Sequence, residues 1–255
     1  MPADGLFARN WRGFLLRLSS VALFLVVWFW TQSALGSRLP ASGRLGDQLH
    51  NLTAPLNAYF AASPRAANAL LIFSSALIDA FALFLIGSWL FLARLRPFLG
   101  LVLLMATRQA VQALCSLPIP DGMIWRYPGF PSLLVTYGVS SDFFFSGHTA
   151  IAVYGAVELA RFRGNWLTAL AVLIAILEAA IVLVLRAHYT MDVFAGAITA
   201  LWVASLTRHT SSSSARNPQQ NLATAQAVIC KSEKNYSPQN DGSGFSSSKP
   251  TSHAS

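Results

Sequence analysis

Long apolar runs, separated by short polar segments that carry arginine, dominate this chain. About 20 apolar residues are needed to cross a hydrocarbon core of about 30 Å. Six runs meet that length, at 13–34, 66–92, 97–115, 143–161, 165–185 and 189–207. The first is too long for the apolar part of a signal peptide, and no soluble domain follows it. The pattern predicts an all-α, polytopic membrane protein, a six-transmembrane-helix bundle.

Composition supports this interpretation. The 255 residues are 54% hydrophobic and 11% charged, with a mean hydropathy of +0.49, which leaves too few charges for a soluble surface. A net charge of +8 would suggest a nucleic-acid partner for a soluble protein. Here the arginines mostly flank the apolar runs, so they are interpreted as topology signals and no nucleic-acid partner is expected.

Arginines gather at four places between or beside the runs. They are Arg9, Arg12 and Arg17; Arg94 and Arg96; Arg161 and Arg163; and Arg208 and Arg216. The positive-inside rule places these four segments in the cytosol. The expected organisation is a cytosolic N-terminus at 1–12, a six-span domain at 13–208 and a cytosolic C-terminal segment.

Residues 209–255 are rich in Ser, Asn, Gln, Thr and Pro and contain all the lysines. Such a composition cannot bury enough apolar surface to fold, so a disordered tail is expected. Cys115 and Cys230 lie in unlike surroundings and imply no disulfide framework.

Two short polar motifs carry the candidate chemistry. Ser146-Gly147-His148 starts the fourth run, and His188-Tyr-Thr-Met-Asp192 starts the sixth, so the topology places both histidines at the outer face. On a helix, the i,i+4 spacing would put His188 and Asp192 on one side. The carboxylate could then hold one imidazole nitrogen and leave the other to attack a substrate.

Phosphoryl transfer also needs an acid for the leaving oxygen, and His148 is the candidate. Ser146 and Gly147, at a helix N-terminus, could present a hydroxyl and N–H groups to phosphate oxygens, and Arg186 could add a bidentate cation. A lone interfacial histidine is often only a polar anchor, but two motifs on one face disfavour that interpretation. No metal or other cofactor is expected, because the motifs lack a further Cys or Glu ligand at suitable spacing.

Several other polar residues have more than one interpretation. Asp79 and Glu178 fall near the middles of spans and are expected to be neutral or paired inside the bundle. Arg108 could pair with one of them or contact phosphate. Asp121 could face a choline ammonium, although Pro-Asp-Gly is also an ordinary turn.

An outer loop between the third and fourth runs is rich in aromatic residues. Trp125, Tyr127 and Phe130 could enclose a quaternary ammonium by cation–π contact. Interfacial belts have the same composition, and the belt is the favoured interpretation.

The motifs resemble those of a known family. Asp142-Phe-Phe-Phe-Ser-Gly-His-Thr149 and His188-Tyr-Thr-Met-Asp192, preceded by Arg108 and Leu117-Pro-Ile-Pro120, closely resemble the signature segments of the sphingomyelin synthase and phosphatidylcholine:diacylglycerol cholinephosphotransferase family. That family belongs to the lipid phosphatase/phosphotransferase superfamily. The resemblance covers residues 94–207.

The resemblance implies a six-span enzyme that transfers phosphocholine from phosphatidylcholine to diacylglycerol through a phosphohistidine. It implies that His188 is the nucleophile, Asp192 its orienting partner, and His148 the acid and then the base. Ser146, Gly147, Arg186, Arg108, Asp121 and Tyr189 are the residues expected to bind substrate.

Departures from the superfamily pattern bear on the acceptor. The lipid phosphatases have a first motif with Lys and Arg-Pro, whereas this chain has Trp89 and then Arg96-Pro97. Val182 stands where their third motif has Arg, which disfavours simple phosphatase action. Arg186-Ala187-His188 is more like the Arg-Gly-His of plant-type diacylglycerol cholinephosphotransferases than like sphingomyelin synthases. Ceramide and water nevertheless remain alternative acceptors.

A transporter or a lipid-binding scaffold is the alternative from another class. Transporters often contain inverted repeats, and none is detected here. The location expected for the enzyme is the endoplasmic reticulum or Golgi of a eukaryote, or the inner membrane of a bacterium, with the active site on the lumenal or outer face. Neither the head group nor the oligomeric state follows from the sequence.

Overall fold

The computed structural model describes residues 4–37, 42–137, 144–161 and 165–208, and these form helices and loops without a strand. All of them belong to one compact unit, Met1–Ser211. Two predicted features lie outside the described residues: the tail at 209–255, which contains Cys230, and Asp142 of the first motif.

The helices are α1 (Asp4–Gly36), α2 (Gln48–Leu52), α3 (Ala54–Ala62), α4 (Pro64–Leu90), α5 (Leu95–Leu114), α6 (Gly147–Ala160), α7 (Asn165–Val184) and a last helix, Thr190–Arg208.

Five helices of the described chain are long and apolar enough to cross a membrane. They are Trp11–Gly36 within α1, α4, α5, α7 and the last helix. The protein is therefore an all-helical, multi-pass membrane protein within the described residues. α6 has 14 residues, or about 21 Å at 1.5 Å per residue, which is shorter than a hydrocarbon core. The count of six spans stays a prediction.

The expected fourth span, 143–161, is wrong at its N-terminal end. Phe144 and Phe145 are not helical, and Phe145 has a φ of 77°, which a right-handed helix cannot include. α6 begins at Gly147, and Ser146 is its N-cap, because the Ser146 hydroxyl accepts a hydrogen bond from the Thr149 N–H. Apolar composition alone could not reveal this break.

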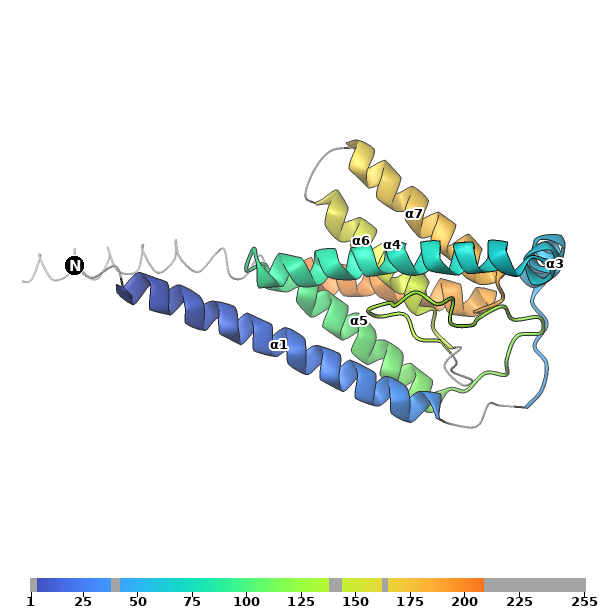
Figure 1. Cartoon of the computed structure of the whole chain (residues 1–255), viewed down its shortest axis with the longest axis horizontal. Coiled ribbons are helices and arrows are strands. Elements are labelled where there is room, and N and C mark those ends of the chain that lie inside the picture. The colour runs from blue at the N-terminus through green and yellow to red at the C-terminus, as the bar shows by residue number, and fades with distance from the viewer. Residues whose placement is uncertain (1–3, 38–41, 138–143, 162–164, 209–255) are drawn as a thin grey trace, which may run out of the picture. The chain divides into compact units, whose positions relative to one another are not determined.

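The loop ahead of α6 runs back into the bundle. Leu134 and Val135 are buried, and Asp79, near the middle of α4, accepts hydrogen bonds from the N–H groups of Leu133 (2.8 Å) and Leu134 (3.2 Å). Figure 1 shows this loop, in light green, alongside α4. Non-helical backbone at membrane depth is tolerated where protein surrounds it and satisfies its polar groups. Asp79 performs that task here.

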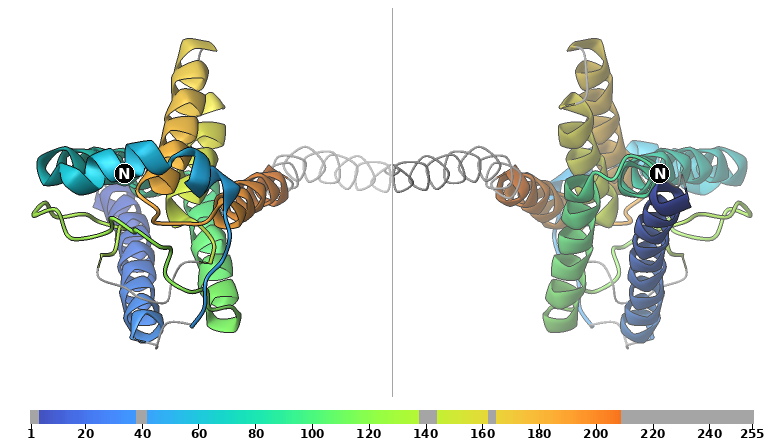
Figure 2. Two further views of the ribbon diagram at one scale, coloured as in Figure 1. Left: turned by 90° about the vertical axis from the view of Figure 1, so that its right-hand side faces the viewer. Right: turned by 90° about the vertical axis from the view of Figure 1, so that its left-hand side faces the viewer.

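α4 and the last helix lie between α7 on one side and α1 and α5 on the other (Figures 1 and 2). α6 packs against α4, α5 and α7, so it is the centre of the bundle. Its Tyr154 is fully buried, and its ring occupies the space beside Gly100 of α5, where an added β-carbon would lie 1.8 Å from the hydroxyl oxygen. A small residue is required there for the two helices to approach.

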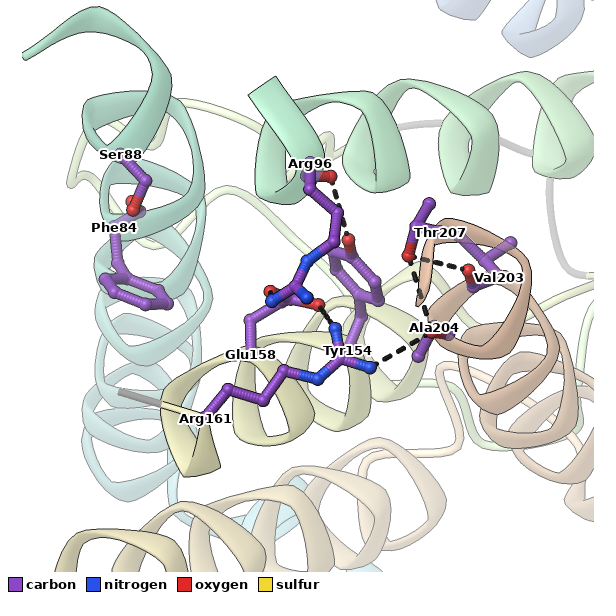
Figure 3. Close-up of polar contacts among 9 residues, drawn as sticks. All are labelled: Phe84, Ser88, Arg96, Tyr154, Glu158, Arg161, Val203, Ala204 and Thr207. Carbon is purple, nitrogen blue, oxygen red and sulfur yellow. Dashed lines mark hydrogen bonds and ion pairs between the residues drawn. The ribbon is translucent and has the colours of Figure 1, made fainter. Parts of the chain in front are cut away.

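A buried charge cluster joins three helices at the C-terminal end of α6 (Figure 3). The fully buried carboxylate of Glu158 pairs with Arg96 of α5 at 2.8 Å and with Arg161, whose Nη2 donates to the carbonyl of Ala204 in the last helix at 3.1 Å. Tyr154 donates its hydroxyl to the Arg96 carbonyl at 3.2 Å. Arg96, considered above as a topology signal and as part of a phosphatase-like motif, thus has a structural partner. The sequence analysis missed Glu158.

Candidate active site

The two motif histidines line one cavity. It lies where α5, the N-terminus of α6, the re-entering loop and the segment before the last helix meet, and it encloses about 40 Å³. A single water needs about 10–15 Å³, so the cavity accepts a larger polar group. Of the candidate residues, Arg108, Gly147, His148 and His188 line it. The structure thus places His148 and His188 at the same cavity.

His188 and Asp192 lie close together, but not because both are helical. His188 is in a bend, and the last helix begins at Thr190, so the expectation of a shared helix face is wrong for His188. Its Nδ1 lies 3.9 Å from Asp192 Oδ2, which also accepts the Tyr189 N–H at 2.9 Å. The carboxylate reaches back to the residue before the helix, as in a capping box. That cap holds the carboxylate beside the imidazole.

The two motifs are joined through the backbone. The Ser146 N–H donates to the carbonyl of Asp192 at 3.0 Å. Gly196, one turn further along the last helix, lies so close to Ser146 that an added β-carbon would be 2.6 Å from the Ser146 carbonyl oxygen. The N-terminus of α6 therefore rests directly on the last helix. The Ser146 hydroxyl caps α6, and Ser146 does not line the cavity.

His148 faces an aromatic wall. The Trp125 ring meets the imidazole edge to face, with centroids 5.0 Å apart, and Trp125 is oriented by its own Nε1–H bond to the Thr136 carbonyl at 3.0 Å. Among the residues that the structure describes, His148 Nε2 is buried and has no hydrogen-bond partner. The favoured belt interpretation does not fit Trp125, whereas Tyr127 and Phe130 are exposed as a belt requires.

Arg108 is buried in the cavity wall. Its Nη1 donates to Gln32 Oε1 at 2.9 Å, and its guanidinium lies 5.4 Å from the centre of the Trp28 ring. Both partners come from α1. The position of Gly147 admits the guanidinium, since an added β-carbon would be 3.0 Å from Arg108 Nε. Arg108 thus lies in the wall of the cavity beside Gly147.

The two carboxylates considered as partners of Arg108 have other contacts. Asp79 binds the re-entering loop, and Glu178 Oε2 accepts the Ser74 hydroxyl at 2.6 Å. Glu178 Oε1 is buried without a hydrogen-bond partner among the described residues, so the expectation that both groups are neutral or paired stays a prediction.

Besides Ser146, three further expected substrate ligands lie outside the cavity lining. Arg186 donates to the carbonyls of Asp121 (2.5 Å) and His50 (3.3 Å). Asp121 is exposed in a turn and pairs with Arg44 at 3.3 Å. Tyr189 donates its hydroxyl to the Pro118 carbonyl at 3.2 Å. In this geometry they hold the outer segments together around the histidines.

A second polar pair, Asp47 and His50, was missed by the sequence analysis. His50 Nε2 lies 2.9 Å from the carbonyl oxygen of His188, and its ring stacks on Tyr189. Asp47 caps α2 and accepts hydrogen bonds from Thr190 through its N–H (2.6 Å) and hydroxyl (2.7 Å). Partial burial acts to raise the Asp47 pKa, but the bonds from Thr190 and the His50 N–H outweigh it, and the net pKa lies below 3.8. The only sequence signal was the cap pattern of Asp47 ahead of a short helix.

Comparison with known proteins identifies the family. The family model described as AtPDCT1/2 matches residues 47–209, which include every candidate site residue. The chain belongs to this family. Its activity is therefore phosphatidylcholine:diacylglycerol cholinephosphotransferase-like, as the resemblance in the motifs implied. The family match begins at Asp47, so it includes the Asp47 and His50 pair but not α1.

Other comparisons add less. A search of curated proteins gives no match. Among solved structures, the chain is similar to the crystal structure of Aquifex aeolicus LpxE, with 18% identity and a TM-score of 0.48, over 67% of this chain and 99% of that one.

Proposed function

We propose that this protein transfers phosphocholine from phosphatidylcholine to diacylglycerol through a phosphohistidine at His188. The observation that carries the proposal is the shared cavity of His148, His188 and Arg108, with Asp192 behind His188. These are a nucleophile, an acid, a cation for phosphate and an orienting carboxylate. Membership of the AtPDCT1/2 family supports the choice of donor and acceptor.

In the first half-reaction, His188 attacks the phosphorus of phosphatidylcholine. Because Nδ1 faces Asp192, Nε2 is the attacking nitrogen. A P–N bond forms, the P–O bond to the glycerol breaks, and His148 donates its proton to the departing oxygen, so that diacylglycerol leaves. Arg108 stabilises the negative charge on the phosphoryl oxygens. The 3.9 Å separation of Asp192 and His188 tightens as the imidazole gains positive charge, as catalytic pairs often do in the reacting complex.

In the second half-reaction, a new diacylglycerol binds. His148, now neutral, accepts the proton of its hydroxyl, the oxygen attacks phosphorus, and the P–N bond breaks to restore His188. No other reactant is consumed. Gly147 and Arg108 contact the phosphoryl group, while Ser146, Arg186 and Tyr189 position the two motifs and Asp121 stabilises the outer turn.

We also propose that α6 completes a six-span topology together with the loop that leads into it. The arginine distribution then puts both termini in the cytosol and the histidines on the lumenal or outer face. The endoplasmic reticulum or Golgi is the proposed location in a eukaryote, and the inner membrane in a bacterium.

The test uses purified protein in nanodiscs with choline-labelled phosphatidylcholine and acyl-tagged diacylglycerol. Choline label is expected on the tagged backbone, and His188→Ala and His148→Ala should each abolish transfer while the protein still inserts. With phosphorus-labelled donor alone, wild-type protein should retain label on His188. Transfer by His188→Ala would contradict the nucleophile assignment.

Ceramide and water are the alternative acceptors. Soluble labelled phosphocholine without labelled lipid would identify water. Preferential transfer to ceramide in a mixture of equal parts ceramide and diacylglycerol would identify sphingomyelin synthesis.

A further inference from the structure

An apolar groove between α1 and α5 adjoins the catalytic cavity. It encloses about 540 Å³, within the range of about 300–1,000 Å³ typical of ligand sites. Leu23, Val27 and Phe24 of α1 and Val102 and Ala106 of α5 form most of its apolar wall. Trp28 and Met105 line both this groove and the cavity that contains the histidines. The groove and the cavity therefore lie against the same two side chains.

A second groove of about 730 Å³, between α6, α7 and the last helix, is larger. It shares no lining residue with the cavity of His148 and His188. The larger volume of this second groove therefore does not connect it with the reaction. The α1–α5 groove is the better candidate because it shares Trp28 and Met105 with the cavity.

The position of the α1–α5 groove within the membrane determines which ligand can occupy it. It lies between two helices that are long and apolar enough to span the membrane, so its open side faces the hydrocarbon. An acyl chain is the ligand that matches such a wall. Gln109, which lines the groove, and Arg108, which lines the cavity, both donate to Gln32 of α1, so a polar contact adjoins the apolar groove on the side of the cavity wall. This order, apolar then cationic, matches a lipid whose tail lies in the groove and whose phosphate lies in the cavity.

α1 is the less buried wall of this groove. Only 11% of its apolar window is buried, compared with 44% for α4 and for α5. The family match begins after α1, which makes this wall the part of the site that lies outside the shared region.

We infer that the α1–α5 groove binds an acyl chain of the diacylglycerol moiety and serves both half-reactions. This inference rests on the proposed function. Phosphatidylcholine without its phosphocholine is diacylglycerol, so the product of the first step and the acceptor of the second are the same kind of molecule. The groove that accepts an acyl chain of phosphatidylcholine can therefore also accept an acyl chain of diacylglycerol. A substitution in the groove must then affect the binding of both substrates equally.

The first experiment labels the groove without turnover. His188→Ala protein in phosphatidylglycerol nanodiscs is irradiated with a diacylglycerol that carries a diazirine midway along one acyl chain, and adducts are mapped by mass spectrometry. Adducts should be enriched at Leu23, Val27, Val102 and Ala106 over Leu173, which is exposed on α7. Adding Ala106→Trp, which fills the groove from α5, should remove the enrichment. Even labelling of all exposed faces, or enrichment in the groove beside α7, would overturn the inference.

The second experiment uses the active protein. Ala106→Trp should raise KM for phosphatidylcholine and for diacylglycerol by a similar factor of about ten or more, with a smaller effect on kcat. Ala180→Trp, at an exposed alanine of α7 that lines neither groove, is the matched control and should change neither constant. A rise in only one of the two KM values would contradict a shared groove. Groove-specific labelling in a protein without transfer activity would leave the lipid site standing and refute the proposed reaction.

Discussion

Gly196 of the last helix lies against the carbonyl oxygen of Ser146, at a distance that leaves no room for a β-carbon. This contact, with the hydrogen bond from the Ser146 N–H to the Asp192 carbonyl, joins the two histidine motifs. The relative position of His148 and His188 therefore depends on a backbone contact between segments distant in sequence.

Gly196→Ala is expected to lower both activity and stability. The added methyl would lie 2.6 Å from a backbone oxygen, so the two segments must separate, at a cost of about 1–3 kcal/mol for overpacking. Gly87→Ala in α4 is the control, because its β-carbon would meet only the Phe91 ring at 3.7 Å. Thermal unfolding in detergent and transfer kinetics measure the two effects. Unchanged kinetics in Gly196→Ala would show that the contact does not position the site.

Asp192→Asn is expected to reduce kcat by about 10²–10⁴-fold. The asparagine oxygen can still accept the Tyr189 N–H, but the amide carries no charge to stabilise a cationic His188. KM and the melting temperature should change far less than kcat. An equal fall in stability and activity would instead assign Asp192 to the helix cap alone.

Glu158→Gln is expected to destabilise the protein without acting on the cavity. The buried carboxylate balances the charges of Arg96 and Arg161. Removal of one partner from a buried ion pair costs about 3–5 kcal/mol, and the lower figure applies here because both arginines are partly exposed. Asp121→Asn, in the exposed pair with Arg44, should change the melting temperature little. A melting temperature for Glu158→Gln that matches wild type would refute this role.

The Asp47 carboxylate makes a pH-dependent contribution to stability. Its pKa in the folded protein lies below the ordinary 3.8, so the contribution is fully present above about pH 4 and is lost as the pH falls through the lower folded value. Asp47→Asn should lower the melting temperature at pH 7, and the difference from wild type should shrink below pH 3.8. Melting curves of both proteins between pH 2.5 and 7 test this. A difference that stays constant to pH 2.5 would contradict it.

Some site residues could be predicted because their pattern is local. The spacing of His188 and Asp192 was sufficient to pair them, although a helix cap rather than a helix face brings them together. Arg186 and Ser146 were predicted to contact phosphate because they adjoin the histidines in sequence. Adjacent residues on an irregular segment point in different directions, and both side chains have backbone partners instead.

Contacts over long sequence separations could not be predicted in this way. Gln32 meets Arg108, His50 meets the His188 carbonyl, and Trp125 meets His148, and none of these pairs has a periodic signal. The first depends on how α1 packs against α5, and the other two depend on how the outer segments fold back at one end of the bundle.

The sequence by itself determined that this is a helical membrane protein of the cholinephosphotransferase family, with two histidine motifs. Hydrocarbon thickness sets the length of apolar runs, and phosphoryl chemistry requires particular residue types. Only the tertiary structure decided where α6 begins, that the loop before it re-enters the bundle, and that α1 supplies one wall beside the site. These features follow from close packing and from the need to satisfy buried backbone groups, which depend on neighbours that the linear pattern does not identify.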